Sequence, residues 1–517
     1  MVPRGRPCTS RAGRSYLVSD LTRAGVGDVD FGWGKAVYGG PAKGGVGEIP
    51  MVSFYIPYRN GIVVPVCLPA PAMERFVKEI EIMKPVLVAP AKPTPHEFKH
   101  LSDIDDQEGL RFQIPAIQFY SKEPAMSGKD PAKVIREALG RALVFYYPYA
   151  GRLREWSGRK LVVECTGEGV LFIEADANVR LQDFGDELQP PFPCFEELLF
   201  DVPGSGGVLN SPLILIQVTR LSCGGFIVAI RFNHTMSDGQ GMVLFMNAVA
   251  EMARGATAPS VLPVWSRELL NARTPPCPTF AHREYDNVPD IKGTNTLVHE
   301  VVQRSIFFGP REVLALRMRL PEHLRKSSTV EILTACLWRC RTIALQPDPE
   351  EDMRLMCLVN SRGKGRKRLP LGYYGNAFSY PAAVSSAKRL CSEPLGYALE
   401  LVKKAKSEGT SDEYLQSVAD LMVLRGRPHF TVVRSYLVSD LTRVGFGDVD
   451  FGWGKAVFAG PANGGVGEIP VVSFYIPYRN GIVVAVCLPG PAMERFVKEM
   501  ESMISEIPAH GPLKSSL

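Results

Sequence analysis

The stretch His234-Thr235-Met236-Ser237-Asp238-Gly239 marks a sharp turn between an apolar strand and a helix, and the elements on both sides of it can be assigned from the sequence. Before it, residues 213–218 and 226–232 are apolar runs that predict two strands joined at Cys223-Gly224-Gly225. After it, apolar side chains recur at helical spacing and predict a helix with one packing face: Met242, Phe245, Met246 and Val249. Ser237 or Asp238 is expected to cap that helix.

A histidine at the end of a strand points to general-base chemistry. Neutral imidazole accepts a proton near neutral pH, so His234 can deprotonate a hydroxyl or an amine. Asp238, four residues later, can fix the loop or the ring. A turn histidine with a capping aspartate satisfies the same pattern without any chemistry, so this motif alone leaves both interpretations open.

A second motif decides between them. It reads Asp450-Phe451-Gly452-Trp453-Gly454-Lys455-Ala456 and lies about two hundred residues downstream. In this order and at this separation the two motifs resemble the plant BAHD acyltransferases, and the resemblance extends from about Met83 to the end. Residues 149–153, 333–339 and 373–377 are also similar to family signatures, whereas residues 86–95 and 372–378 resemble the alcohol acyltransferase group, which includes benzyl alcohol benzoyltransferases.

The resemblance implies an α/β fold with two chloramphenicol-acetyltransferase-like domains of mixed sheet and helices. Residues 83–258 are then the N-terminal domain and residues 291–517 the C-terminal domain. Between them, prolines and polar residues at 259–290 break the periodicity and predict a long crossover connection. A channel along the domain interface is expected to pass His234, with alcohol entering from one side and acyl-coenzyme A from the other.

The implied reaction is direct acyl transfer from acyl-coenzyme A, a cosubstrate, to an alcohol, with no metal and no bound cofactor. His234 removes the hydroxyl proton and returns it to the departing thiolate, so no covalent enzyme intermediate is needed. A nucleophilic Ser237 is disfavoured, because residues three apart on one tight loop rarely align and no Gly-x-Ser-x-Gly elbow occurs.

The candidate catalytic residues are His234, Asp238 and Asp450, and the resemblance also assigns roles to the two aspartates. Asp238 is expected to point away from the channel and to hold its loop through an arginine, for which Arg362 is the candidate. Asp450 is expected to support the channel structurally, although such a residue is often counted as catalytic. Trp453 is a large apolar anchor, and either its indole or a nearby backbone amide is a hypothesis for the oxyanion donor.

Trp453 and two further positions are candidates for coenzyme A binding. Ser327, Ser328 and Thr329 precede the helix expected at 332–343 and can hold a phosphate through backbone amides and the helix dipole, or simply cap the helix. Asn376, between Gly375 and Ala377, lines the pantetheine arm or shapes a turn.

Composition narrows the class of protein. The hydrophobic share is 45% and the charged share 22%, as in globular proteins, and the net charge of +5 indicates no general nucleic-acid or membrane role. The basic run 362–368 is interpreted as a solvated loop rather than a nuclear signal or a phosphate-attracting rim. Eleven scattered cysteines without paired clusters favour packed thiols in a reducing compartment, so a cytoplasmic location is expected. The family resemblance implies a monomer.

The two ends of the chain are near-copies. Residues 14–81 repeat residues 434–501 at a constant offset of 420 and differ at nine positions. Such closeness indicates a recent duplication or a misassembled gene model rather than an old structural repeat. The fold is expected to offer one slot for this unit and the C-terminal copy to fill it. Residues 1–82 are then not integrated, and residues 83–517 form the functional enzyme.

Two alternatives stay open at the level of sequence. In the first, the protein is an acyltransferase of the same family that uses an amine acceptor or transfers a hydroxycinnamoyl group. Otherwise the chain is a non-catalytic relative that binds acyl-coenzyme A.

Overall fold

The computed structural model describes residues 17–20, 52–58, 61–63, 80–184, 188–192, 195–289, 301–363, 369–465 and 469–505. The chain divides into two compact units, Met1–Glu81 and Ile82–Leu517, and β4 (Ile80–Ile82) spans the boundary between them in the sequence. None of the helices among these residues combines the length and the apolar character that a membrane crossing requires.

The first unit contains a small sheet in the order β1-β2-β3, formed by β1 (Leu17–Asp20), β2 (Val52–Tyr58) and β3 (Gly61–Val63). β1 pairs with β2 in parallel, with Leu17 opposite Val52. In the second unit Leu437 lies opposite Val472, which is the same pairing 420 residues later. The two copies of the repeat therefore form the same local strand arrangement. Asp30-Phe31-Gly32-Trp33-Gly34 lies outside the described residues.

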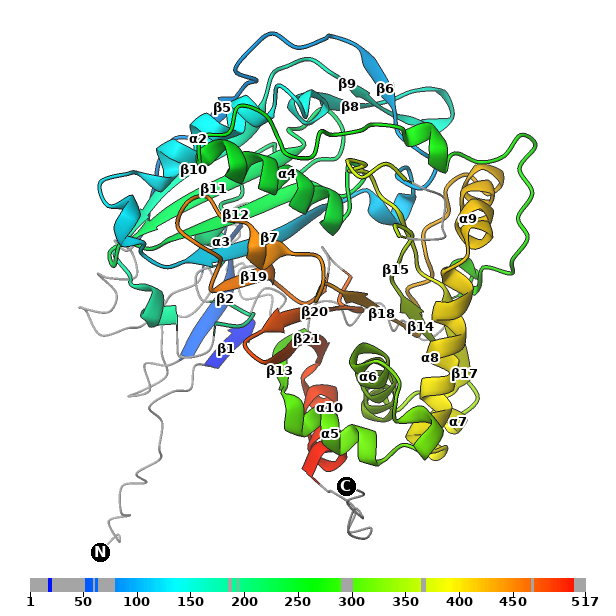
Figure 1. The fold of residues 1–517 in the computed structure, drawn as a ribbon. Coiled ribbons are helices and arrows are strands. Elements are labelled where there is room, and N and C mark those ends of the chain that lie inside the picture. Colours follow the sequence, from blue (N-terminus) through cyan, green and yellow to red (C-terminus); the bar gives the residue numbers. More distant parts are fainter. Residues whose placement is uncertain are drawn as a thin grey trace, which may run out of the picture. The chain divides into compact units, whose positions relative to one another are not determined.

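One sheet of the second unit has the strand order β19-β7-β12-β11-β10, and β5 pairs with β10. Helices α2 (Pro131–Ala142) and α4 (Gly239–Ala253) cover one face of this sheet (Figure 1). The β11 and β12 side chains are almost all buried, as expected of central strands covered on both faces. The strands are β5 (Val86–Val88), β7 (Gln113–Tyr120), β10 (Val170–Ala177), β11 (Ile214–Leu221), β12 (Phe226–Asn233) and β19 (Phe458–Pro461).

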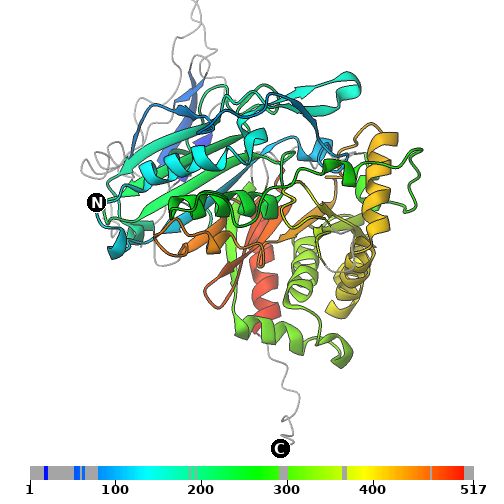
Figure 2. The same ribbon diagram turned by 45° about the horizontal axis from the view of Figure 1, so that its top comes forward.

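The other sheet has the order β13-β21-β20-β18-β14-β17. Helices α5, α6, α7, α8 and α10 pack below it, with α6 near the middle of the layer (Figures 1 and 2). The strands are β13 (Val301–Phe308), β14 (Asp352–Cys357), β17 (Ala382–Ser386), β18 (Ser435–Asp440), β20 (Val472–Tyr478) and β21 (Gly481–Pro489). The helices are α5 (Pro310–Met318), α6 (Thr329–Leu345), α7 (Ala387–Ser392), α8 (Leu395–Gly409), α9 (Asp412–Leu424) and α10 (Gly490–Ser505).

Shorter elements complete the second unit. They are the three-stranded sheet of β6 (Phe98–His100), β9 (Leu161–Glu164) and β8 (Arg152–Glu155), the pair β15 (Val359–Asn360) and β16 (Phe378–Ser379), and α3 (Phe195–Leu198). Residues 259–289, expected to be a long connection, contain only two short 3-10 helices, Arg267–Leu270 and Arg283–Tyr285. Of the basic run 362–368, only Arg362 and Gly363 belong to the described residues.

One strand crosses between the two halves of the second unit. β19, which follows the Asp450-Phe451-Gly452-Trp453-Gly454 loop, pairs with β7 as the edge of the first sheet (Figure 1). The Tyr120 hydroxyl on β7 also donates a hydrogen bond to the Val449 carbonyl oxygen at 2.9 Å. A division of the sequence at 259–290 assigns this segment to the C-terminal domain, whereas in the structure it completes the N-terminal sheet.

Candidate active site

His234 follows β12 directly, and its backbone N–H donates a hydrogen bond to the Phe112 carbonyl oxygen at 2.9 Å. The helix α4 then begins at Gly239, with Asp238 as its N-cap residue accepting a hydrogen bond from the Gly241 amide at 2.9 Å. The predicted strand, turn and helix are therefore confirmed. The Ser237 hydroxyl is fully buried and accepts a hydrogen bond from the Tyr149 hydroxyl. That contact gives no support to a nucleophilic Ser237.

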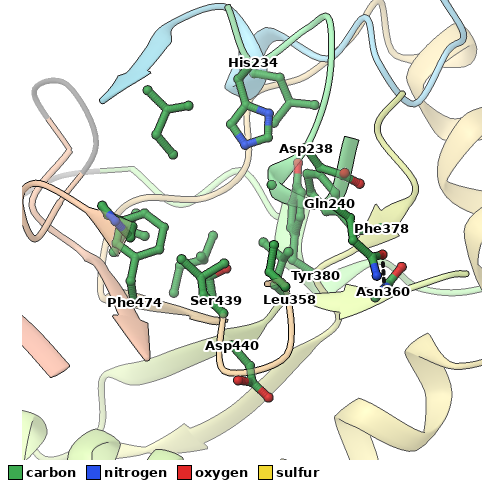
Figure 3. A pocket seen from close by; sticks show the side chains of 18 of the residues that line it. His234, Asp238, Gln240, Leu358, Asn360, Phe378, Tyr380, Ser439, Asp440 and Phe474 are labelled. Atoms are coloured by element: carbon green, nitrogen blue, oxygen red, sulfur yellow. Dashed lines mark hydrogen bonds between the residues drawn. The ribbon is translucent and has the colours of Figure 1, made fainter. Parts of the chain in front are cut away.

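A cavity of about 480 Å³ opens beside His234, between the two sheets of the second unit (Figure 3). One wall comes from β7 and β12 and the opposite wall from β18 and β20. Most of the lining is apolar, and it includes six phenylalanines: Phe112, Phe232, Phe378, Phe430, Phe446 and Phe474. Polar and charged side chains also line it, among them Gln240, Asn360, Arg362, Lys406, Ser439, Asp440 and Arg443.

The hydrogen bonds of Asn376 fix the orientation of the His234 ring. The Asn376 Nδ2 atom donates to the His234 carbonyl oxygen at 2.8 Å and to Asp105 Oδ1 at 2.9 Å. The Asn376 Oδ1 atom therefore faces His234 Nδ1 at 3.1 Å and accepts its proton. The other ring nitrogen, Nε2, remains unprotonated, and the ring points into the cavity (Figure 3).

Burial also favours the neutral form of His234. The surrounding protein desolvates the imidazole and lowers its pKa below the ordinary value, although Asp238 and Asp105 oppose this shift. At neutral pH the ring is uncharged, with a free lone pair on the nitrogen that faces the cavity. This is the state that a general base requires.

Asp238 lines the same cavity, but its carboxylate is directed away from the His234 ring (Figure 3). Its Oδ2 atom accepts hydrogen bonds from Arg362 Nη1 at 2.7 Å and from the Ala377 amide at 3.0 Å. The predicted ion pair with Arg362 is present. These contacts hold the loop that carries His234, as expected of Asp238, and a direct catalytic part for this residue stays a prediction.

Asp450 and Trp453 are not among the residues that line the cavity. Asp450 Oδ1 accepts hydrogen bonds from the Gly452 and Gly454 amides at 2.7 and 2.8 Å and so closes its own turn. Both glycines have positive φ angles, which that turn requires. Trp453 is buried, with its ring centroid 5.2 Å from that of Phe226. The geometry matches the structural interpretation of this motif and gives no support to the indole as oxyanion donor.

The residues predicted to bind coenzyme A lie at a helix start or in the buried interior. Ser328 and Glu331 form a capping box at the start of α6, and the Thr329 hydroxyl accepts a hydrogen bond from Arg317 Nη2. Ser327, Ser328 and Thr329 are absent from the cavity lining, so the helix-cap interpretation is realised and contact with the cosubstrate stays a prediction. Asn376 is fully buried and its side-chain amide is bonded to His234, so contact with a pantetheine arm stays a prediction.

Two residues that hold Asn376 in place could not be identified from the sequence. Asp105 and Arg267 are buried and ion-paired at 2.8 Å, and Asp105 accepts a hydrogen bond from the Asn376 amide. A signal existed in the loop Ser102-Asp103-Ile104-Asp105-Asp106, where three acids occur within four residues. Its partners lie more than 160 positions downstream, beyond the reach of any local pattern.

The chain resembles known proteins over nearly its whole length. The Transferase family matches residues 6–83 and again residues 78–503. The benzyl alcohol O-benzoyltransferase of Petunia hybrida is 67% identical over 435 residues, which are 83% of this chain and 94% of that protein. The corresponding Nicotiana tabacum enzyme is 67% identical over 447 residues, or 85% and 96%. An alcohol acyl transferase 1 allele product of Malus domestica, GSd, is 56% identical over 441 residues, or 83% and 95%.

Solved structures agree on the fold. Vinorine synthase superposes with a TM-score of 0.64 at 21% identity, covering 82% of this chain and 98% of that one. F. sporotrichioides TRI101, crystallised with coenzyme A and T-2, gives 0.58 at 17% identity, covering 78% and 97%. The predicted α/β fold with two sheet-containing domains is confirmed. By the family match and the identity of 56–67% to the Petunia, Nicotiana and Malus proteins, the chain belongs to the Transferase family, the BAHD acyltransferases.

Proposed function

We propose that this enzyme transfers a benzoyl or acetyl group from acyl-coenzyme A to a small alcohol such as benzyl alcohol. The observation that carries the proposal is the neutral His234 ring, held through Nδ1, with Nε2 facing a cavity lined mainly by aromatic and aliphatic side chains. An apolar wall favours substrates with an aromatic ring or an alkyl chain over polyhydroxylated ones. The names of the similar Petunia, Nicotiana and Malus enzymes support the same reaction class.

The reaction follows from the free Nε2 lone pair. The alcohol hydroxyl donates its proton to His234 Nε2 while its oxygen attacks the thioester carbonyl carbon. The C–S bond of the tetrahedral intermediate then breaks, and the imidazolium returns the proton to the leaving thiolate. Because a thiolate is a much weaker base than an alkoxide, the transfer runs towards the ester. Asp238 and Arg362 hold the loop and do not exchange protons with the substrate.

Acyl-coenzyme A enters as a cosubstrate, and no resident cofactor takes part in this scheme. Its phosphates need positive charge, and Arg362, Lys406 and Arg443 contribute it to the cavity lining. Lys406 also pairs with Glu331 in the first turn of α6, with an N–O distance of 3.3 Å. This ion pair connects the cavity to the helix start at Ser327, Ser328 and Thr329, where we place the phosphate end of the cosubstrate.

We also assign the enzyme to the cytosol as a monomer. The cytosolic assignment is supported by the free cysteines of the described residues, several of them buried, which suit a reducing compartment. The monomer is what the family resemblance implies. Subcellular fractionation and the mass measured by light scattering after size-exclusion chromatography test the two assignments.

The central test is free thiol release by the purified chain from benzoyl- and acetyl-coenzyme A with benzyl alcohol. We expect alcohol-dependent release, and a loss of about 10²- to 10⁴-fold in kcat for His234→Ala. His323→Ala is the matched control, because that histidine lies on the surface. An amine and hydroxycinnamoyl-coenzyme A complete the panel. If turnover occurs only with the amine or with hydroxycinnamoyl-coenzyme A, the proposed substrates are wrong. If the protein binds acyl-coenzyme A but turns over none of these substrates, the proposal that it is an enzyme is wrong.

A further inference from the structure

A chain of buried polar contacts leads from the His234 ring to an ion pair that the reaction itself does not use. Asp105 Oδ1 accepts hydrogen bonds from the Asn376 backbone amide and from Asn376 Nδ2, both at 2.9 Å. It also accepts one from Arg267 Nη1 at 2.8 Å. Asp105 Oδ2 accepts from the Ser102 amide and hydroxyl at 3.1 and 2.6 Å. Both carboxylate oxygens are therefore fully engaged.

Arg267 is enclosed in the same way. It is 1% exposed, and its guanidinium lies 4.5 to 5.4 Å from the ring centroids of Trp265, Tyr373 and Tyr374. Its Nη2 atom donates to the Met236 carbonyl oxygen, within the loop that carries His234, at 2.8 Å. Gly375 gives it room, because a Cβ atom at that position would overlap Nη1.

A buried ion pair of this kind contributes little net stability, since desolvating both charges offsets most of their attraction. Its geometric consequence is larger. The side-chain amide of Asn376 can face His234 with either its oxygen or its NH₂ group. Only the oxygen accepts a proton from Nδ1 and leaves Nε2 free. With the NH₂ group facing the ring, Nδ1 becomes the acceptor and the ring proton moves to Nε2, where it blocks proton uptake.

We propose that Asp105 is a positioning residue that fixes the Asn376 amide and thereby selects the His234 tautomer with an unprotonated Nε2. The inference rests on the proposed general-base function. Asp105 touches neither substrate nor reacting atoms and acts through Asn376, and Arg267 locks it in place. Asp238 also acts electrostatically on the ring, and it is paired with Arg362.

Asp105→Asn is the direct test. The change removes the negative charge and one of the two acceptor oxygens at position 105, so the Asn376 NH₂ group is held there less strongly and the flipped amide gains population. Asp106→Asn is the matched control, because Asp106 is the adjacent residue and is equally buried. Its partners are Arg111 at 2.9 Å, Arg427 at 2.7 Å and the Leu161 amide, none of which contacts His234 in the described residues.

We expect both variants to lower the thermal midpoint of unfolding, because Asp105→Asn removes the counter-charge of the buried Arg267 and Asp106→Asn removes that of the partly buried Arg427. Only Asp105→Asn is expected to lower kcat, by about 10- to 100-fold, as for other residues that orient a functional histidine. The KM for benzoyl-coenzyme A should stay within about twofold, because the cavity lining is unchanged. An equal kcat loss in Asp106→Asn would overturn the proposal.

The decisive readout is the imidazole ¹⁵N spectrum of the full chain, in which His234 is assigned by its absence from His234→Ala. Nε2 is expected to be unprotonated in the wild type and in Asp106→Asn, and protonated in part or in full in Asp105→Asn. An unchanged tautomer overturns the positioning role even if activity falls. A shifted tautomer in a chain that turns over no acyl-coenzyme A upholds it and overturns the proposed function instead.

Asn376→Ala covers the case in which Asp105→Asn does not fold. It leaves the Arg267–Asp105 ion pair intact but removes the acceptor for Nδ1. The same mixed tautomer and the same loss of kcat are expected. A wild-type tautomer in this variant overturns the proposal.

Discussion

Asp238 Oδ2 accepts a hydrogen bond from Arg362 Nη1 at 2.7 Å, and this ion pair joins two loops 124 residues apart. One loop carries His234 and begins α4, and the other follows β15 in the second half of the chain. Asp238 also caps the helix through the Gly241 amide. The aspartate of the motif therefore fixes the position of the histidine from two directions, without any contact with its ring.

We expect a double-mutant cycle of Asp238→Asn and Arg362→Gln to show strong coupling. Each single change leaves a mostly buried partner without its counterpart, so the free energies of unfolding should be non-additive by about 0.5 to 3 kcal/mol. Denaturant unfolding of the four proteins measures it. The exposed pair Lys455 and Asp448 is the control and should show no measurable coupling. Additive effects at Asp238 and Arg362 would contradict a structural role for the pair.

The activity of the enzyme should decline only on the acidic side of the ordinary histidine pKa of about 6.5. Burial lowers the His234 pKa, so protonation, which removes the base, begins at a lower pH than for a free imidazole. A pH profile of kcat/KM should show a single acidic limb with a midpoint below 6.5. Since the fold favours the neutral ring, the unfolded chain takes up this proton more readily, and the free energy of unfolding decreases as the pH falls below 6.5. A midpoint above 6.5 would show that the ring is not desolvated as described.

The parts of this site that could be predicted from sequence are those fixed by neighbouring residues. Apolar periodicity locates β12 and α4, and a short polar side chain before Gly239 gives the helix cap. The Arg362 partner of Asp238 was also predicted correctly, through the family resemblance rather than through spacing.

The other parts depend on contacts between distant segments. Asn376 contacts His234, 142 residues away in the sequence, and Asp105, 271 residues away. Sequence periodicity cannot predict contacts at such separations. The crossing of β19 into the first sheet is likewise set by pairing with β7, more than 300 residues away. A buried charge such as Arg267 is also hidden from local analysis, since an arginine in a loop ordinarily indicates solvent exposure.

Gly375→Ala tests whether the guanidinium of Arg267 must approach the backbone closely. A Cβ atom at position 375 would overlap Arg267 Nη1, so either Arg267 or the loop before Asn376 must shift. We expect a destabilisation of about 1 to 3 kcal/mol and a lower kcat. Gly206→Ala is the control, because a Cβ atom there meets nothing within 4 Å. Equal stabilities for the two variants would contradict the packing described around Arg267.

Asp450→Ala should damage the fold more than the chemistry. The change leaves the Gly452 and Gly454 amides without their acceptor, at a cost of about 1 to 3 kcal/mol. Well below the lowered thermal midpoint, we expect kcat within about tenfold of wild type, since Asp450 does not line the cavity. Asp448→Ala, on the exposed side of the same loop, is the control. A kcat loss comparable to that of His234→Ala would give Asp450 a direct role in the reaction.

The near-identical ends of the chain provide a test of which copy completes the active site. Val444 and Phe446 line the cavity, and the first copy has Ala24 and Val26 at the equivalent positions. All residues that line the cavity lie between Gly109 and Phe474. We therefore expect residues 83–517 alone to match the full chain in kcat and in the KM for benzyl alcohol.

The double substitution Val444→Ala and Phe446→Val gives the shorter protein the side chains of the first copy. Loss of the Phe446 ring removes apolar contact from the cavity wall, so the KM for benzyl alcohol should rise roughly tenfold, while bulkier alcohols gain relative to it. If the full chain shows the selectivity of this variant rather than that of residues 83–517, the first copy forms the wall. Matching selectivity between the full chain and residues 83–517 assigns the wall to the second copy.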